Sequence, residues 1–326
     1  MNENAINRYL HGRYFTVVIF CFTIISTLIA LYSGRIPQFG SNYGICLPSS
    51  NLWINNPLLS YAVNIALISG IAVMLIITNK AFSFIRGVTS IFASIFLLLE
   101  SCNPYITTQL FDGTIMCLVT VTGMFILYSI YQTPQLKQRI YLIFALLSLC
   151  CMFQYAFVFI IPVFITGIIQ MRAFTFKGFV AAVLGVITPF WILTGLGVIS
   201  LDKFVIPQIT NVFTITGWEK ATPLLVSVGA TALISFVFLI IKMIHIYNSK
   251  LQVRAYNGFI SILTLFTIIM ICIDYNNFFT YIPLLNCCAA IQIAHFFTNN
   301  KYLRKYIIVI VLITGYLALY IWGILQ

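Results

Sequence analysis

The stretch YLIFALLSLCCMFQYAFVFIIPVF, residues 141–164, decides how this chain is threaded. It is apolar over most of its length and is interrupted near its middle by the polar pair Gln154-Tyr155. With its flanks, the run from 140 to 170 is long enough for one tilted membrane helix or for two short ones. Because one crossing or two crossings would orient everything downstream in opposite ways, the fold depends on this choice.

The composition excludes a soluble domain. Hydrophobic residues make up 61% of the 326 residues and charged residues only 7%, whereas soluble domains are about half apolar and about a quarter charged. At about 20 apolar residues per crossing, the chain has room for roughly ten or eleven membrane helices and little else. We therefore expect residues 1–326 to form a single integral membrane domain that is all-α and polytopic.

Apolar runs predict about eleven transmembrane helices. They lie at 14–32, 57–78, 82–99, 112–131, 140–153, 155–170, 178–200, 223–241, 257–273, 278–298 and 306–325. The first run is too long for the core of a signal peptide and is followed by no A-x-A cleavage site, so we expect a retained helix.

The positive residues orient these helices. If the N-terminus is cytoplasmic, fourteen of the 17 Lys and Arg residues fall in inner gaps, and only Arg35, Lys203 and Lys220 fall outside. Such a bias is typical of bacterial inner-membrane proteins. Eleven crossings then place the C-terminus outside the cytoplasm.

Charge also decides the stretch from 140 to 170. A single crossing there would put the basic gaps at 242–254 and 301–305 outside, against the orientation bias. We therefore predict two short helices with Gln154-Tyr155 at the tip of a tight hairpin. A polar Gln near the membrane needs a protein partner or water, and we favour a packing hydrogen bond over part of a cavity.

The longest connections, 33–56 and 201–222, are predicted to lie outside. The second has apolar residues at helical spacing, which fits either a short interfacial helix or an extended lid-like loop. Cys46 and Cys102 are the two cysteines predicted in outer loops, either bonded to each other or as two free thiols.

The outer acids are the candidate catalytic residues, because a carboxylate near a membrane surface is expensive to bury. Glu100 and Asp112 flank one outward loop, and partial burial would suit either of them to act as a general base. For Asp112 we favour a structural role, as a cap at the N-terminus of its helix beside the positive end of the helix dipole. Asp274 lies in a short turn rich in Asn, where Asp is an ordinary turn former.

The outward cations Arg35 and Lys203 are candidates for binding the phosphate of a lipid-linked substrate. The alternative is pairing with the acids beside them. The three histidines and nine cysteines show no metal-ligand spacing, so we expect no metal and no cofactor. The dispersed basic clusters favour membrane lipids over nucleic acid as partners.

From Phe96 to Ile165 the order of parts resembles that of the C-type glycosyltransferases, which use polyprenyl-phosphate sugars. The parts are Asn103-Pro104 after a helix, Asp112 opening the next, a basic gap and then residues 141–164. Gln154 stands where that superfamily often has Lys, and Pro162 matches the end of its motif. The superfamily characteristically has a catalytic Asp in the first outer loop, but Ser33 to Asn56 contains no acidic residue.

The whole chain is also similar to a family of polytopic inner-membrane proteins from Bacteroidetes, which implies a location in the cell envelope and no particular activity. Three functions stay open. The first is an assembly or scaffold subunit of an envelope complex, as a non-catalytic relative of the C-type enzymes. The second is an active lipid-linked sugar transferase facing the outer leaflet, and the third is a lipid or solute transporter.

Overall fold

The computed structural model describes residues 13–33, 45–85, 90–133, 137–198, 222–246, 250–274, 277–298 and 305–325. Within these ranges the regular structure is entirely helical, so the all-α prediction is confirmed. The elements are α2 (Arg13–Tyr32), the 3-10 turn η1 (Ser50–Leu52), α3 (Pro57–Phe82), α4 (Ile91–Ser101), α5 (Pro104–Thr107), α6 (Asp112–Tyr128), α7 (Lys137–Cys151), α8 (Ala156–Gln170), α9 (Phe176–Gly195), α10 (Thr222–Ile246), α11 (Leu251–Ile273), α12 (Phe278–Thr298) and α13 (Lys305–Leu325).

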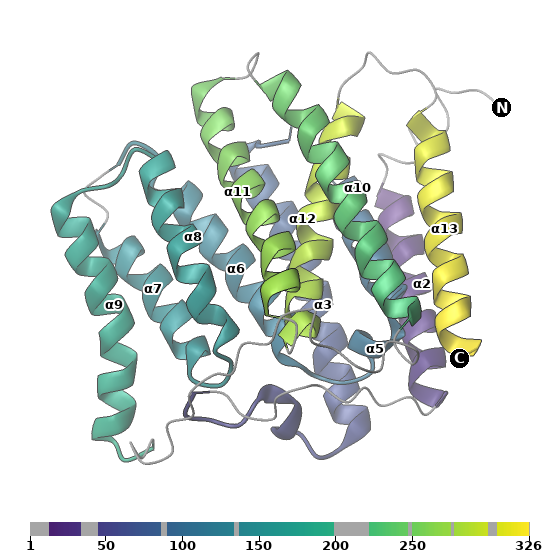
Figure 1. Ribbon diagram of the computed structural model, residues 1–326, viewed down its shortest axis with the longest axis horizontal. Coiled ribbons are helices and arrows are strands. Elements are labelled where there is room, and N and C mark those ends of the chain that lie inside the picture. Colours follow the sequence, from purple (N-terminus) through teal and green to yellow (C-terminus); the bar gives the residue numbers. More distant parts are fainter. Residues whose placement is uncertain are drawn as a thin grey trace.

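The long helices stand side by side, with α9 and α13 at the two ends of the long axis of the molecule (Figure 1). Asp112 begins α6 and Asp274 ends α11 at the lower edge of that view, which we call the carboxylate end. Arg172 follows α8 and Arg254 lies in the first turn of α11 at the upper edge, which we call the basic end.

Seven helices are long and apolar enough to cross a membrane, and this supports a multi-pass membrane protein. They are α2, α3, α9, α10, α11, α12 and α13. The apolar helices α4, α6 and α8 are shorter. Large apolar side chains face outward at the periphery, as Phe176 and Trp191 of α9 do with 80% and 78% of their surface exposed, which suits contact with lipid.

Helix α12 is the centre of the bundle and packs against α4, α6, α10 and α11. Of its 18-residue apolar window 89% is buried, and its hydropathy of 1.3 is the lowest of the seven candidate spans. Asn286 and Gln292 are completely buried on it. Polar side chains are acceptable in α12 because protein surrounds this helix.

The predicted hairpin at 140–170 is confirmed. Helices α7 and α8 have 15 residues each and are joined by a turn that contains Gln154 and Tyr155. At about 1.5 Å per residue each arm reaches about 22 Å, which is less than the hydrocarbon core of about 30 Å.

The predicted helix at 82–99 begins later than expected, at Ile91. Ser83 has a left-handed backbone with φ of 48° and ends α3, and the side chain of Asn79 accepts a hydrogen bond of 2.9 Å from the amide of Ile85. This cap turns the chain away from the axis of α3, which a count of apolar residues does not reveal.

Candidate functional site

Asp274 is the centre of a buried hydrogen-bond network at the carboxylate end. Its side chain is 0% exposed. Its Oδ1 accepts from the Tyr155 hydroxyl at 3.0 Å, and its Oδ2 accepts from the Tyr281 hydroxyl at 3.2 Å. The Asn277 amide donates to both oxygens, at 3.1 and 3.3 Å, and also to the Tyr155 hydroxyl.

Gln154 extends this network from the tip of the α7–α8 hairpin. Its Nε2 donates to Asn277 Oδ1 at 3.3 Å and to Thr280 Oγ1 at 3.2 Å. The predicted packing role of Gln154 is therefore confirmed. We call Gln154, Tyr155, Asp274, Asn277 and Tyr281 the carboxylate network; it joins the hairpin tip to the end of α11 and the start of α12.

The environment of Asp274 perturbs its acidity. Burial raises the pKa of this carboxyl above the ordinary Asp value, and the hydrogen bonds from Asn277, Tyr155 and Tyr281 oppose the rise without cancelling it. Turn formation alone, which the sequence favoured for Asp274, does not describe the position. The carboxyl is an interhelical acceptor for donors from two segments, the hairpin tip and the start of α12.

Asp112 does not cap its own helix. It is the first residue of α6, and the N-cap position belongs to Phe111. Its Oδ1 instead accepts from the amide of Ser50 at 2.8 Å, so the carboxylate reaches across to the predicted first outer loop. The favoured capping interpretation is wrong because a distant backbone donor competes with the amides of the helix itself.

The described part of the predicted first outer loop, from residue 45 to residue 56, also lies on the hairpin tip. The amides of Cys46 and Leu47 donate to the carbonyl of Met152 at 3.0 and 2.9 Å. The ring of Trp53 packs edge-on against that of Phe153, with centroids 5.1 Å apart. The hydrogen bond to Ser50 therefore places Asp112 where this loop meets the hairpin.

Contact with the start of α12 connects Asp112 to the carboxylate network. A Cβ added to Gly113 would lie 2.9 Å from the backbone oxygen of Thr280, so α6 and α12 touch at this point. Since the Thr280 hydroxyl belongs to the hydrogen bonds of Gln154, Asp112 and Asp274 lie in one connected region.

Glu100 occupies a different environment, in the last turn of α4. It is 1% exposed, and its Oε1 has no hydrogen-bond partner among the described residues. The segment after it, predicted as an outward loop, is buried: Asn64 of α3 donates to the carbonyls of Ile106 and Thr107, both at 3.2 Å. Glu100 therefore faces the helix core.

Several predicted features fall outside the described residues. These are Arg35, Lys203 and the suggested interfacial helix at 201–222, apart from Thr222, which begins α10. Cys46 and Cys102 are both free thiols, so the alternative of a disulfide between them is wrong. Among the described residues, no group of three or more His, Cys, Asp or Glu side chains could hold a metal ion.

A second buried polar cluster lies around Lys242, between the last turns of α10 and the first turns of α11. The sequence placed this lysine in an inner gap, but it is part of α10 and only 7% exposed. Its Nζ donates to the carbonyl of Asn257 at 3.3 Å, and Asn257 Nδ2 in turn donates to the carbonyl of Phe84 at 3.2 Å. The lysine therefore bonds to an adjacent helix instead of facing solvent.

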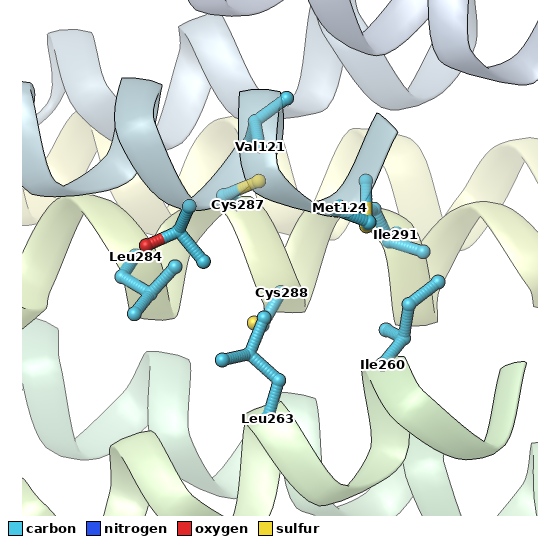
Figure 2. Close-up of a pocket in the computed structure, with 9 residues that line it drawn as sticks. Val121, Met124, Ile260, Leu263, Leu284, Cys287, Cys288 and Ile291 are labelled. Atoms are coloured by element: carbon cyan, nitrogen blue, oxygen red, sulfur yellow. The ribbon is translucent and has the colours of Figure 1, made fainter. Parts of the chain in front are cut away.

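Figure 2 shows a small void between α6, α11 and α12, lined by apolar and sulfur-containing side chains such as Met124, Leu263 and Cys288. Its volume is about 10 Å³, which is marginal for one water molecule. We therefore interpret this void as a packing defect of the core.

Sequence reasoning missed Tyr155, Asn277 and Tyr281 as partners of Asp274. A signal for Asn277 was present in the motif Asp274-Tyr275-Asn276-Asn277. This polar run directly precedes a helix, so it places Asn277 close to Asp274. For Tyr155, 119 residues away from Asp274 in the chain, a single sequence offers no such signal.

Comparison with protein-family models, with curated proteins and with solved structures found no match.

Proposed function

We propose that this chain is a multi-pass protein of the bacterial inner membrane that serves as an assembly or scaffold subunit of the cell envelope. On this proposal it is a non-catalytic relative of the C-type glycosyltransferases. The observation that carries the proposal is the enclosure of Asp274. Both its oxygens accept hydrogen bonds from side chains of the protein, and none of its surface is exposed.

An enclosed carboxylate of this kind joins helices and is poorly placed for chemistry. A general base must come within hydrogen-bond distance of the proton that it removes. For Asp274 this would require the displacement of Tyr155, Tyr281 or Asn277, whose donors would then be buried without acceptors. The network therefore supports a structural role.

The test is purification of the tagged full-length protein from its native host in a mild detergent, followed by mass spectrometry. A scaffold subunit should bring down a partner in constant ratio, and Asp112→Asn should recover the same partner in the same amount. Recovery of the isolated protein alone would count against the proposal.

One observation favours the transferase as a second candidate. The C-type layout expects an acid in the first outer loop, and here Asp112 comes to that loop from α6 through its hydrogen bond to Ser50. At 7% exposure it is the most accessible of Glu100, Asp112 and Asp274. In this role Asp112 would take the proton from an acceptor hydroxyl, whose oxygen bonds to the sugar carbon as the bond to the polyprenyl phosphate breaks.

This second candidate predicts a different outcome for the same variant. Membranes containing the wild-type protein should convert an added polyprenyl-phosphate hexose to polyprenyl phosphate, and Asp112→Asn should abolish the conversion while membrane insertion stays normal. Unchanged conversion in Asp112→Asn would remove Asp112 as the base.

A further inference from the structure

A cavity lies at the basic end, away from the carboxylate network. It has a volume of about 390 Å³ and lies between the α8–α9 turn, the end of α10 and the start of α11. Arg172, Arg254, Gln170 and Tyr131 contribute polar groups to its lining. A cavity of this size is within the range of small-molecule sites.

The charge of this cavity is one-sided. Two arginines are among the residues that line it, and neither Asp nor Glu is among the described residues of its wall. Arginine is the side chain best matched to phosphate, because its planar fork donates two parallel hydrogen bonds to adjacent oxygens. Basic pockets between membrane helices are typical sites for phosphate head groups.

Arg172 lies in a tightly fixed turn with an unusual backbone conformation. Arg172 has a φ of 56°, a left-handed conformation that favours Gly at the end of a helix. The turn is fixed by hydrogen bonds from the amides of Ala173 to Ile168 and of Gln132 to Met171, at 3.2 and 3.1 Å. An arginine is present where glycine would suit the backbone better.

The remaining wall indicates an amphiphile. Met243 and Leu251 line the cavity and are 43% and 58% exposed, so the cavity has an open apolar side that suits an acyl chain.

We propose that the cavity between Arg172 and Arg254 binds a phosphate group, held between two guanidinium groups as part of an anionic membrane lipid. The site is independent of the proposed function, because it lies at the opposite end of the bundle from the carboxylate network.

The test uses the full-length protein in neutral detergent and native mass spectrometry. The probes are phosphatidylglycerol, diacylglycerol with the same acyl chains but no phosphate, and inorganic phosphate as a competitor. Three variants report on the site: Arg172→Gly, which suits the left-handed backbone, Arg254→Gln, and Ala255→Phe, which fills the cavity without changing its charge. The control Lys177→Gln removes an exposed charge that does not line the cavity.

Wild-type protein should retain phosphatidylglycerol and not diacylglycerol. Arg172→Gly and Arg254→Gln should each weaken binding about tenfold or more, as expected for a charge-assisted hydrogen bond, and Ala255→Phe should also weaken it. Lys177→Gln should change it less than twofold. Every variant must elute as a single folded species, which separates lost binding from lost fold.

Competition by inorganic phosphate distinguishes the source. Binding of lipid that millimolar phosphate does not displace identifies a lipid site, whereas binding of phosphate alone with the same dependence on Arg172 and Arg254 identifies a site for free phosphate. Equal losses in Lys177→Gln and Arg172→Gly would overturn the proposal, since they would indicate general surface charge. Full binding in Ala255→Phe would also overturn it, because the ligand would then lie outside the cavity.

Discussion

At the scale of single residues, burial separates three acids that look alike in the sequence. Asp274 is enclosed by donors, Asp112 holds the amide of a distant loop, and Glu100 faces the helix core. The effect of replacing each acid depends on its hydrogen-bond partners, because a buried carboxylate is stable only where other groups donate hydrogen bonds to it.

Replacement of Asp274 by Ala should destabilise the protein. The Tyr155 and Tyr281 hydroxyls and the Asn277 amide would lose a shared acceptor, and a buried unsatisfied donor costs about 1–3 kcal/mol. We expect a loss of about 1–3 kcal/mol in the free energy of unfolding, measured in detergent by titration with SDS. In a double-mutant cycle, Tyr155→Phe should cost less in the Asp274→Ala background than in the wild type; additive effects would contradict the network.

The raised pKa of Asp274 predicts a pH dependence with a defined sign. The folded state binds the proton of Asp274 more tightly than the unfolded state does. The stability that this proton binding contributes is therefore complete below the ordinary Asp pKa of about 3.9. It is lost as the pH rises through the folded-state pKa. As the pH rises, the free energy of unfolding of the wild type should therefore fall relative to that of Asp274→Asn. SDS titrations of both proteins at several pH values measure this difference. A shift in the opposite direction would contradict a raised pKa.

Some of these residues could be anticipated and others could not. The need of Gln154 for a protein partner follows from a polar residue between two apolar runs, and the structure supplies Asn277 and Thr280. The role of Asp274 could not be anticipated, because a turn-forming Asp and a buried acceptor have the same local sequence, and Tyr155 is remote in the chain.

At the scale of elements, close approach between helices depends on small residues. Helix α9 packs on α7 at Gly185, where an added Cβ would lie 2.6 Å from the carbonyl oxygen of Tyr141 and 3.2 Å from the amide nitrogen of Ala145. These neighbours are backbone atoms and cannot move aside without shifting the helix. Interfaces of this kind are common between membrane helices.

Gly185→Ala should therefore destabilise the packing of α9, whereas Gly195→Ala on the same helix should not. No atom outside the local backbone lies within 4 Å of a Cβ at Gly195. We expect Gly185→Ala to cost about 1–3 kcal/mol, as overpacking usually does, and Gly195→Ala to change stability little. Thermal unfolding followed by size-exclusion chromatography measures both; equal midpoints for the two variants would contradict the close contact.

The helices themselves were the most predictable elements, since apolar runs bounded by charged or polar gaps predict membrane helices. A helix lies at each of the eleven predicted positions and in the predicted order, but only seven of the described helices are long and apolar enough to cross a membrane. The remaining errors lie at the helix ends. The helix expected from 82 begins at Ile91, because the left-handed turn at Ser83 follows from a side-chain cap by Asn79 that hydropathy does not register.

At the scale of the whole molecule, the charge pattern predicts which end faces the cytoplasm. The described basic residues Lys137, Arg139, Arg172 and Arg254 belong to one end of the bundle, and Asp112 and Asp274 belong to the other (Figure 1). The orientation rule assigns the basic end to the cytoplasm.

Single-cysteine labelling in a background without other reactive thiols tests this orientation. Cysteines at Lys137 and Lys301 should be protected from a membrane-impermeant reagent added to cells, and a cysteine at Gln326 should be labelled. Introduced cysteines in α9 facing lipid, such as at Trp191, provide the unreactive control. Labelling that placed Lys137 and Lys301 on opposite faces, or Gln326 inside, would contradict eleven crossings.

The enclosure of α12 has a consequence for biogenesis. A segment of hydropathy 1.3 that contains Asn286 and Gln292 partitions into bilayer less readily than its neighbours when it leaves the translocon. The helices that surround α12 all precede it in the chain, and they can cover its polar side chains; they are α4, α6, α10 and α11. We therefore expect α12 to enter the membrane by packing against helices that were inserted before it, so that correct insertion depends on the order of synthesis.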